Sequence, residues 1–291
     1  MFCSLVCVAE AVSSLRHVIP GSGRVVGVAS LGNMLFVVRC AAGQQIEVYD
    51  TETLLFQGKI SVPGLNSPHG LASCATNKCL YACDCNNNNV YRVGLADITK
   101  ITNWSVSRYP TGLSVNSATG NVFVTCNADN KIQDYTTQGR IDNTGLSYTD
   151  LQYTGITSPW HAIQLSSGHF AVSHDHRVCV IDKSAHIIFS YGFPKTAGSK
   201  VGQFSYPRGL VELNNGCILV ADCNNDRVVA LNSSLSFGKE ITLPVEGGLH
   251  RPWALHYDKS RGRLYIGEFE GGSVLVFDNV SDMQMLDSSV V

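Results

Sequence analysis

Short apolar runs of strand length alternate with turn residues along most of this chain. The clearest stretch lies between Tyr206 and Asn232, where a Pro-x-Gly-Leu start is followed by an alternating segment and an Asn-Asn-Gly turn. An apolar run, a polar loop and a second alternating run complete it. Because each run has strand length and ends at turn residues, the stretch predicts three short antiparallel strands.

This three-strand unit recurs along the chain. The first apolar residue of the third strand marks each unit, which gives Ile46, Val90, Ile132, Val178, Val228 and Val274. Successive markers are 44, 42, 46, 50 and 46 residues apart. Such units, with several short strands and no helical periodicity, are typical of a β-propeller, whose blades bury both faces only against their neighbours. Six units therefore predict an all-β, six-bladed β-propeller.

A fourth, outer strand fits between the units, as in residues 54–62 and 187–192. Too few residues follow Asp278 for an outer strand in the last unit. We therefore expect residues 13–20 to pair with the last blade and close the ring, which removes two exposed sheet edges. This predicts one propeller over residues 13–280, an N-terminal extension or extra strand over residues 1–12, and a C-terminal tail over residues 281–291.

The pattern of the unit resembles the NHL repeat. That repeat starts with Pro-x-Gly followed by Leu, Ile or Val, has an apolar second strand ending in Asp, an Asn-rich loop, and Arg with Val or Ile at the start of its third strand. Residues 206–232 carry every element: Pro207, Gly209, Leu210, Asp222, Asn224, Asn225, Arg227 and Val228. The resemblance covers roughly residues 20–280 and departs where Cys126, His174 and Glu268 replace the Asp. It implies an NHL-like propeller.

Equivalent positions of the six units are expected to form rings around the mouth of the central channel, because the loops that carry them emerge on one face. The first ring, at the Pro-x-Gly position, holds Val26, His69, Thr111, His161 (aligned on Ala162 and Ile163), Arg208 and Trp253. The second ring, at the end of the second strand, holds Arg39, Asp84, Cys126, His174, Asp222 and Glu268. Both rings mix charges and hydrogen-bonding side chains, which predicts a ligand-binding surface.

Two metal-dependent enzymes are alternatives. His69 and His161 suggest zinc, because the pattern also resembles, more distantly, the peptidylglycine amidating lyases, in which His at this ring position supplies a zinc site; the third matching position here is Trp253. A lactonase-like enzyme would hold calcium with carboxylates such as Asp84, Asp222 and Glu268, although Arg39 would share that site. A mouth without metal, in which these groups make structural hydrogen bonds, is the preferred interpretation.

The resemblance also implies a recognition surface, since the NHL propellers of tripartite-motif proteins present this face to single-stranded RNA or to protein partners. The residues suited to RNA are Arg108, Lys131, Arg208, Arg227 and Arg251, interleaved with Tyr109, Trp160, Tyr206 and Trp253. Acidic residues share these loops: Asp129, Asp175, Asp226 and Glu270. The mixture favours a protein or peptide. We therefore predict a non-catalytic binding module without a cofactor, with contacts at Trp160, Trp253, Arg208, His69 and His161.

Composition adds two expectations. The net charge of -2 gives no electrostatic reason to expect nucleic acid or a membrane as an obligatory partner, and the apolar stretch 2–12 is interrupted by Ser4 and Glu10, unlike a secretory signal or a membrane span. Eleven cysteines, an odd number and many of them in apolar strands, favour the reducing cytosol. Three glycosylation sequons, at Asn103, Asn232 and Asn279, would matter only on a secretory route.

Overall fold

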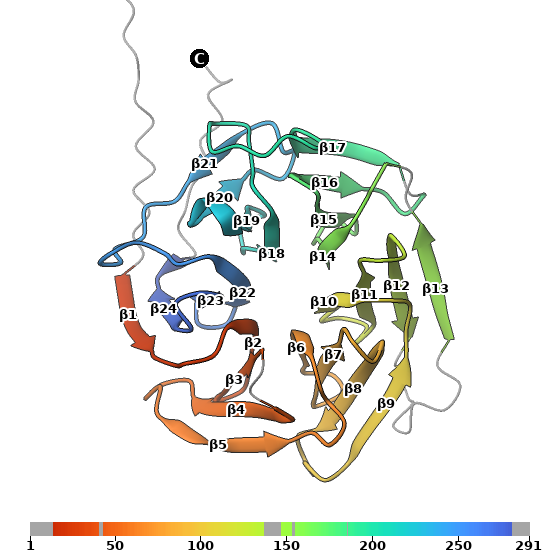
Figure 1. The fold of residues 1–291 in the computed structure, drawn as a ribbon, viewed down its shortest axis with the longest axis vertical. Coiled ribbons are helices and arrows are strands. Elements are labelled where there is room, and N and C mark those ends of the chain that lie inside the picture. Colours follow the sequence, from red (N-terminus) through yellow and green to blue (C-terminus); the bar gives the residue numbers. More distant parts are fainter. Residues whose placement is uncertain (1–13, 41–42, 137–146, 153–154, 185, 281–291) are drawn as a thin grey trace, which may run out of the picture.

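The computed structural model describes residues 14–40, 43–136, 147–152, 155–184 and 186–280. They form six four-stranded antiparallel sheets arranged around a central axis, with the innermost strand of each sheet beside the axis (Figure 1). This confirms the all-β, six-bladed propeller. In the described ranges no helix is long and apolar enough to cross a membrane.

The first three blades are formed by consecutive strands, which follow one another from the axis outward. Blade 1 contains β2 (Val25–Leu31), β3 (Met34–Arg39), β4 (Gln45–Asp50) and β5 (Phe56–Ser61). Blade 2 contains β6 (Pro68–Cys74), β7 (Cys79–Asp84), β8 (Asn89–Gly94) and β9 (Ile101–Ser105). Blade 3 contains β10 (Pro110–Val115), β11 (Val122–Cys126), β12 (Lys131–Thr136) and β13 (Ser147–Gln152).

The other three blades complete the ring. Blade 4 contains β14 (Pro159–Gln164), β15 (Phe170–His174), β16 (Arg177–Ile181) and β17 (Ile187–Gly192). Blade 5 contains β18 (Pro207–Glu212), β19 (Ile218–Asp222), β20 (Arg227–Leu231) and β21 (Gly238–Glu240), with the short 3-10 helix η1 (Cys223–Asn225) after β19. Blade 6 contains β22 (Pro252–Asp258), β23 (Arg263–Glu268), β24 (Val274–Asp278) and, from the other end of the chain, β1 (Ser14–Ile19).

Strand β1 closes the ring as expected. It pairs antiparallel with β24, with Ser14 opposite Asp278 and Ile19 opposite Val274. The last blade thus obtains its outer strand from the beginning of the chain, and β24 is paired along both of its edges. Residues 1–13 and 281–291, which include the expected extension and tail, lie outside the described residues.

Buried side chains between neighbouring blades form the core. Leu219 and Ala221 of blade 5, for example, share one apolar cluster with Leu264 and Ile266 of blade 6. Of the nine cysteines that the structure describes, eight are buried. They pack in the strands and strand ends like other small apolar side chains.

The glycine of the Pro-x-Gly start allows the inner strands to approach one another at the axis. A Cβ atom on Gly112 would lie 2.6 Å from the carbonyl oxygen of Trp160, and one on Gly209 would lie 2.7 Å from that of Trp253. Both distances are far below van der Waals contact. The motif therefore reflects packing around the channel, whichever residue stands at its middle position.

Neighbouring blades are also joined by hydrogen bonds at the loop ends. Tyr109, Ser158 and Arg251, each directly before a proline, adopt left-handed φ angles of 57°, 48° and 51°. Their backbone N–H groups donate to loop side chains of the preceding blade, namely Asn88 (2.8 Å), Asn130 (2.7 Å) and Asp226 (2.7 Å). These bonds offset the cost of a left-handed conformation in residues that have a Cβ atom.

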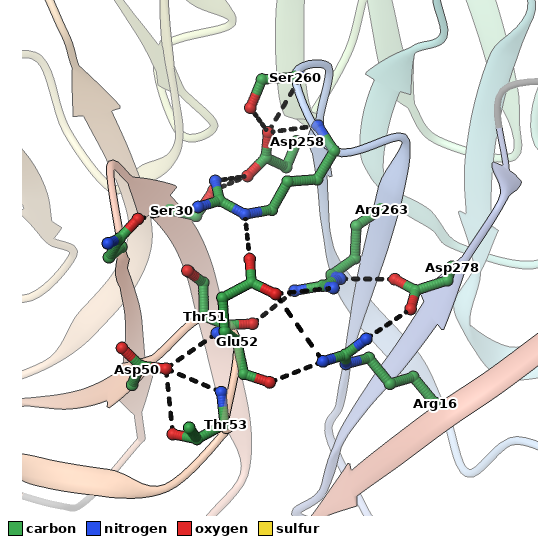
Figure 2. Close-up of polar contacts among 12 residues, drawn as sticks. Arg16, Ser30, Asp50, Thr51, Glu52, Thr53, Asp258, Ser260, Arg263 and Asp278 are labelled. Carbon is green, nitrogen blue, oxygen red and sulfur yellow. Dashed lines mark hydrogen bonds and ion pairs between the residues drawn. The ribbon is translucent and has the colours of Figure 1, made fainter.

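An ionic network fastens the closing blade to blade 1 (Figure 2). Buried Arg263 donates to Asp278 Oδ1 at 2.6 Å and to the carbonyl of Thr51. Arg16 donates to Asp278 Oδ2 at 3.0 Å and to the carbonyl of Glu52 at 2.7 Å. Three strands of blade 6 are therefore linked to the β4–β5 turn by charge-assisted hydrogen bonds.

We expect Arg263→Met to lower the free energy of unfolding by about 2–4 kcal/mol, because it leaves the buried Thr51 carbonyl and one oxygen of Asp278 without a donor. The matched control Arg16→Met should cost less than about 1 kcal/mol, because that side chain is 35% exposed. Urea denaturation followed by circular dichroism measures both. Equal losses of unfolding free energy in the two variants would contradict the larger contribution that we assign to the buried Arg263.

Candidate functional site

Strand register defines which residues are equivalent at the channel mouth. Pro68, Pro110, Pro159, Pro207 and Pro252 each lie opposite the last residue of the second strand of their blade, as does Val25. The next residues form what we call the mouth ring: Val26, His69, Thr111, Trp160, Arg208 and Trp253. In blade 4 the alignment on Ala162 and Ile163 is therefore wrong: Trp160 takes the ring position, and His161 takes the glycine position.

His161 joins three blades instead of facing a ligand. Its Nδ1 accepts a hydrogen bond from the backbone N–H of Leu210 in blade 5 at 3.0 Å. Its Nε2 lies 3.1 Å from the carbonyl oxygen of Leu113 in blade 3 and must donate to it, which fixes the tautomer. Burial lowers the pKa of this imidazole, in line with a neutral ring. Since both nitrogens are occupied, His161 has no lone pair for a metal.

The second ring is not a surface, contrary to our expectation. Arg39, Asp84, Cys126, His174, Asp222 and Glu268 are all buried. The physical reason is that each strand ends beneath the loop that enters its own blade, so that the side chain at the strand end faces that loop. The predicted contacts at these positions are internal.

Four members of the second ring accept a backbone hydrogen bond from the residue two positions before the proline of their blade. Asn66 N donates to Asp84 at 2.7 Å, Ser205 N to Asp222 at 2.7 Å, His250 N to Glu268 at 2.8 Å and Thr157 N to His174 Nδ1 at 3.4 Å. Asp222 also accepts from Asn225 and from Arg227 Nε, at 2.7 and 2.8 Å. Burial raises the pKa of Asp222 and that of Glu268, while these donors act in the opposite direction.

In blade 1 the residue at the end of the second strand is a hydrogen-bond donor instead of an acceptor. Arg39 donates to the carbonyl oxygens of Gly23 (2.9 Å) and Gly272, and its Nε donates to Glu47 at 2.9 Å. Within the described part of the chain, no group of three or more His, Cys, Asp or Glu residues could hold a metal ion. The residues named for zinc and for calcium thus do not converge on a metal site there.

The centre of the mouth is a stack of aromatic rings around Arg208. Its guanidinium carbon lies 3.3 Å from the ring centroid of Trp160 and 4.2 Å from that of Trp253. Trp253 stacks on Phe269 with centroids 4.4 Å apart and meets the edge of Trp160 at 6.0 Å. Arg208 is 9% exposed, and burial lowers its pKa to about 10.

Arg208 has no counter-ion among the residues that the structure describes. None of their carboxylates lies within 4.0 Å of its nitrogens, and the buried Nε and Nη1 atoms have no hydrogen-bond partner there. The Cys223 thiol lies beside the guanidinium, but burial raises the pKa of this thiol, so that it remains neutral. Within the described residues, the cation is therefore contacted by aromatic faces and a neutral thiol, and by no carboxylate.

His69 completes the centre of the mouth. Its ring lies 5.8 Å from the ring of Trp253, and its buried Nδ1 has no hydrogen-bond partner in the described chain. Burial, followed by the charge of Arg208, lowers its pKa to about 4. At neutral pH this is an uncharged imidazole, and its tautomer protonated at Nδ1 can donate one hydrogen bond from that atom.

A rim of less buried aromatic side chains surrounds the mouth ring. Tyr109 and Tyr206 are 37% and 42% exposed, and half-buried Phe269 carries Arg24 over its face at 4.7 Å. Sequence reasoning missed Phe269 and Arg24. Phe269 directly follows the strand-end position in its blade, so that the repeat register could have indicated it, whereas nothing in the repeat marks Arg24.

Two spaces lie in the channel. The mouth ring encloses about 50 Å³, lined by His69, Trp160, Arg208 and Trp253 among others. A larger hollow of about 730 Å³ is lined by the opposite ends of the inner strands. Its polar groups are engaged with one another: Ser30 Oγ lies 2.9 Å from His256 Nε2, and Glu212 accepts from Ser166. Among the described residues, those that line the mouth space include buried polar side-chain atoms without hydrogen-bond partners, and those that line the larger hollow do not.

Comparisons with known proteins identify the fold. No protein-family description matches the sequence, and no curated protein matches it either. Among solved structures, a streptogramin B lyase has a TM-score of 0.66 at 13% identity, over 94% of this chain and 86% of that chain. An auxiliary nutrient binding protein from Bacteroides thetaiotaomicron has 0.69 at 16%, over 89% and 71%. The WD40 β-propeller domain of Doa1 has 0.62 at 12%, over 92% and 97%. At such low identity these likenesses concern the fold alone.

The second ring yields a stability prediction. Asp222→Ala should lower the free energy of unfolding by about 2–4 kcal/mol, because it leaves the Ser205 N–H and Arg227 Nε without their acceptor. The control Asp226→Asn lies in the same loop and keeps an oxygen for the N–H of Arg251, so its effect should stay within about 0.5 kcal/mol. Chemical denaturation measures both. An Asp222→Ala variant as stable as the wild type would contradict the role of Asp222 as the acceptor for these donors.

His69 yields a pH prediction. Its pKa is about 4 in the folded protein and about 6.5 in the unfolded chain, so the unfolded state binds more protons between these values. The stability that the neutral ring contributes is complete above pH ~6.5 and is lost as the pH falls towards 4. We expect His69→Phe to lose less stability than the wild type over this interval, measured from urea midpoints. Identical pH profiles would contradict the low pKa.

Proposed function

We propose that this chain is a non-catalytic, NHL-type propeller that binds a protein or peptide segment across its mouth. The observation that carries the proposal is the aromatic rim, in which Tyr109 and Tyr206 remain exposed around the Arg208 stack. Tyr, Trp and Arg are the residues that dominate protein binding energies, because they bury a large area at a small cost in side-chain entropy. The NHL assignment is supported by the strand-end acceptors and the shared loop geometry of the blades.

RNA is less well supported as the partner. Four of the five basic residues suited to it are paired within the protein: Arg108 with Asp129, Lys131 with Asp150, Arg227 with Asp222 and Arg251 with Glu270. A phosphate backbone is bound chiefly by unpaired Lys and Arg side chains. The faces of Trp253 are also covered, by Phe269 and by Arg208, so that this ring offers no surface for a base.

The test is selection of a random peptide library on the immobilised protein. We expect peptides that compete for one site and whose affinity falls at least about tenfold in the double variant Tyr109→Ala, Tyr206→Ala, since the two exposed aromatic rim residues together should contribute about 1.4 kcal/mol or more. Fluorescence anisotropy of labelled peptides measures the affinity. The matched control is Phe56→Ala, which removes an exposed aromatic side chain from outer strand β5.

Two results would contradict the proposal. One is the absence of any peptide that depends on the mouth. The other is tight retention of a random single-stranded RNA pool with a steep salt dependence, lost in the same double variant, which would favour RNA.

A further inference from the structure

Two of the buried arginines in the described chain, Arg263 and Arg208, have opposite surroundings. Arg263 meets a carboxylate at 2.6 Å, whereas Arg208 meets none among the described residues. Removing a cation from water costs more free energy than its contact with an aromatic face returns. The two tryptophan faces therefore compensate only part of this cost. An anion beside Arg208 would supply the rest.

Three of the buried side-chain atoms that lack a hydrogen-bond partner in the described part of the chain belong to residues that line one space. Arg208, with its unpartnered Nε and Nη1, and His69, with its unpartnered Nδ1, both line the pocket of about 50 Å³ in the mouth ring, as far as the described residues enclose it. Such a volume admits roughly three to five water-sized groups. A carboxylate group fits this space, and a nucleobase does not.

The charge in the pocket limits the kind of anion. Arg208 is the only cation in the described lining of the pocket, and His69 is neutral at physiological pH. A carboxylate carries one negative charge and would leave the buried pair neutral. A phosphoryl group carries about -1.5 to -2 and would leave a buried excess of negative charge. The balance favours a carboxylate.

We propose that Arg208 and His69 recognise the carboxylate of an Asp or Glu side chain that a partner peptide inserts into the mouth ring. The guanidinium edge donates from Nε and Nη1, and His69 donates from Nδ1. The peptide main chain lies across the rim at Tyr109 and Tyr206. This inference rests on the proposed function. It adds which side chain of the partner peptide enters the centre of the mouth.

The first test changes only the ligand. Three pools of random peptides carry Glu, Gln or phosphoserine at one central position and are bound to the wild-type protein. We expect the Glu pool to bind at least about tenfold more tightly than the isosteric Gln pool, as charge-assisted hydrogen bonds require. Equal binding of the Glu and Gln pools would overturn the inference and leave peptide binding intact. Tighter binding of the phosphoserine pool would overturn the assignment to a carboxylate.

The second test changes the protein. Arg208→Met keeps most of the side-chain length and removes the charge, and we expect it to abolish the preference for Glu over Gln, while Arg208→Lys should retain part of it. Without ligand, Arg208→Met should unfold at the same or a higher urea concentration than the wild type, because an uncompensated buried charge is removed. If Arg208 were a structural residue, Arg208→Met would be destabilised, and the preference for Glu would persist in it.

The outcomes separate the two proposals. If no pool binds, both the inference and the proposed function fail. If all pools bind equally and the rim double variant weakens them, only the inference fails. The Phe56→Ala variant again reports any general effect of removing an exposed ring.

Discussion

The loops that enter the blades impose the main constraint on this propeller. In four of the blades this loop brings a backbone N–H group to the buried side chain at the end of the second strand, and a buried polar group without a partner is costly. Asp84, His174, Asp222 and Glu268 supply the acceptors. These positions are therefore polar in most blades because the backbone requires it. Their chemistry differs between blades, since an imidazole nitrogen or a carboxylate oxygen serves equally as an acceptor.

Closure of the ring decides what remains for function. Inner strands meet so closely at the axis that glycine is needed at most of the contacts, and His161, an exception, is used to join blades 3, 4 and 5. The side chains of the mouth ring consequently pack against one another and enclose a small pocket. In the proposed function, recognition has two parts: a broad aromatic rim and a centre that admits one small group.

The buried arginines Arg263 and Arg208 differ in what surrounds their charge. At the seam between blades 6 and 1, Arg263 is surrounded by oxygen atoms and its charge is balanced within the fold. At the mouth, Arg208 is surrounded by rings and a neutral thiol. The fold places a carboxylate beside the first arginine and none of its described carboxylates beside the second, and this difference supports our proposal that a partner supplies the second carboxylate.

The sequence by itself determined the architecture. Period, turn chemistry and the missing last strand predicted six blades and the pairing of β1 with β24, because strand length and alternation are local properties that repeat. It also placed Arg208 and Trp253 in the ring at the mouth and named Trp160 as a contact, while assigning the ring position of blade 4 to His161. Only the tertiary structure decided that the residues of the second ring are buried, that His161 lies one position from the ring, and that Phe269 and Arg24 join the site. The physical reason is that the register of each inner strand that starts with proline follows the shift directly after that proline, and not the apolar residues Ala162 and Ile163, and that burial depends on which loop covers a side chain. Neither is encoded in the spacing of apolar residues.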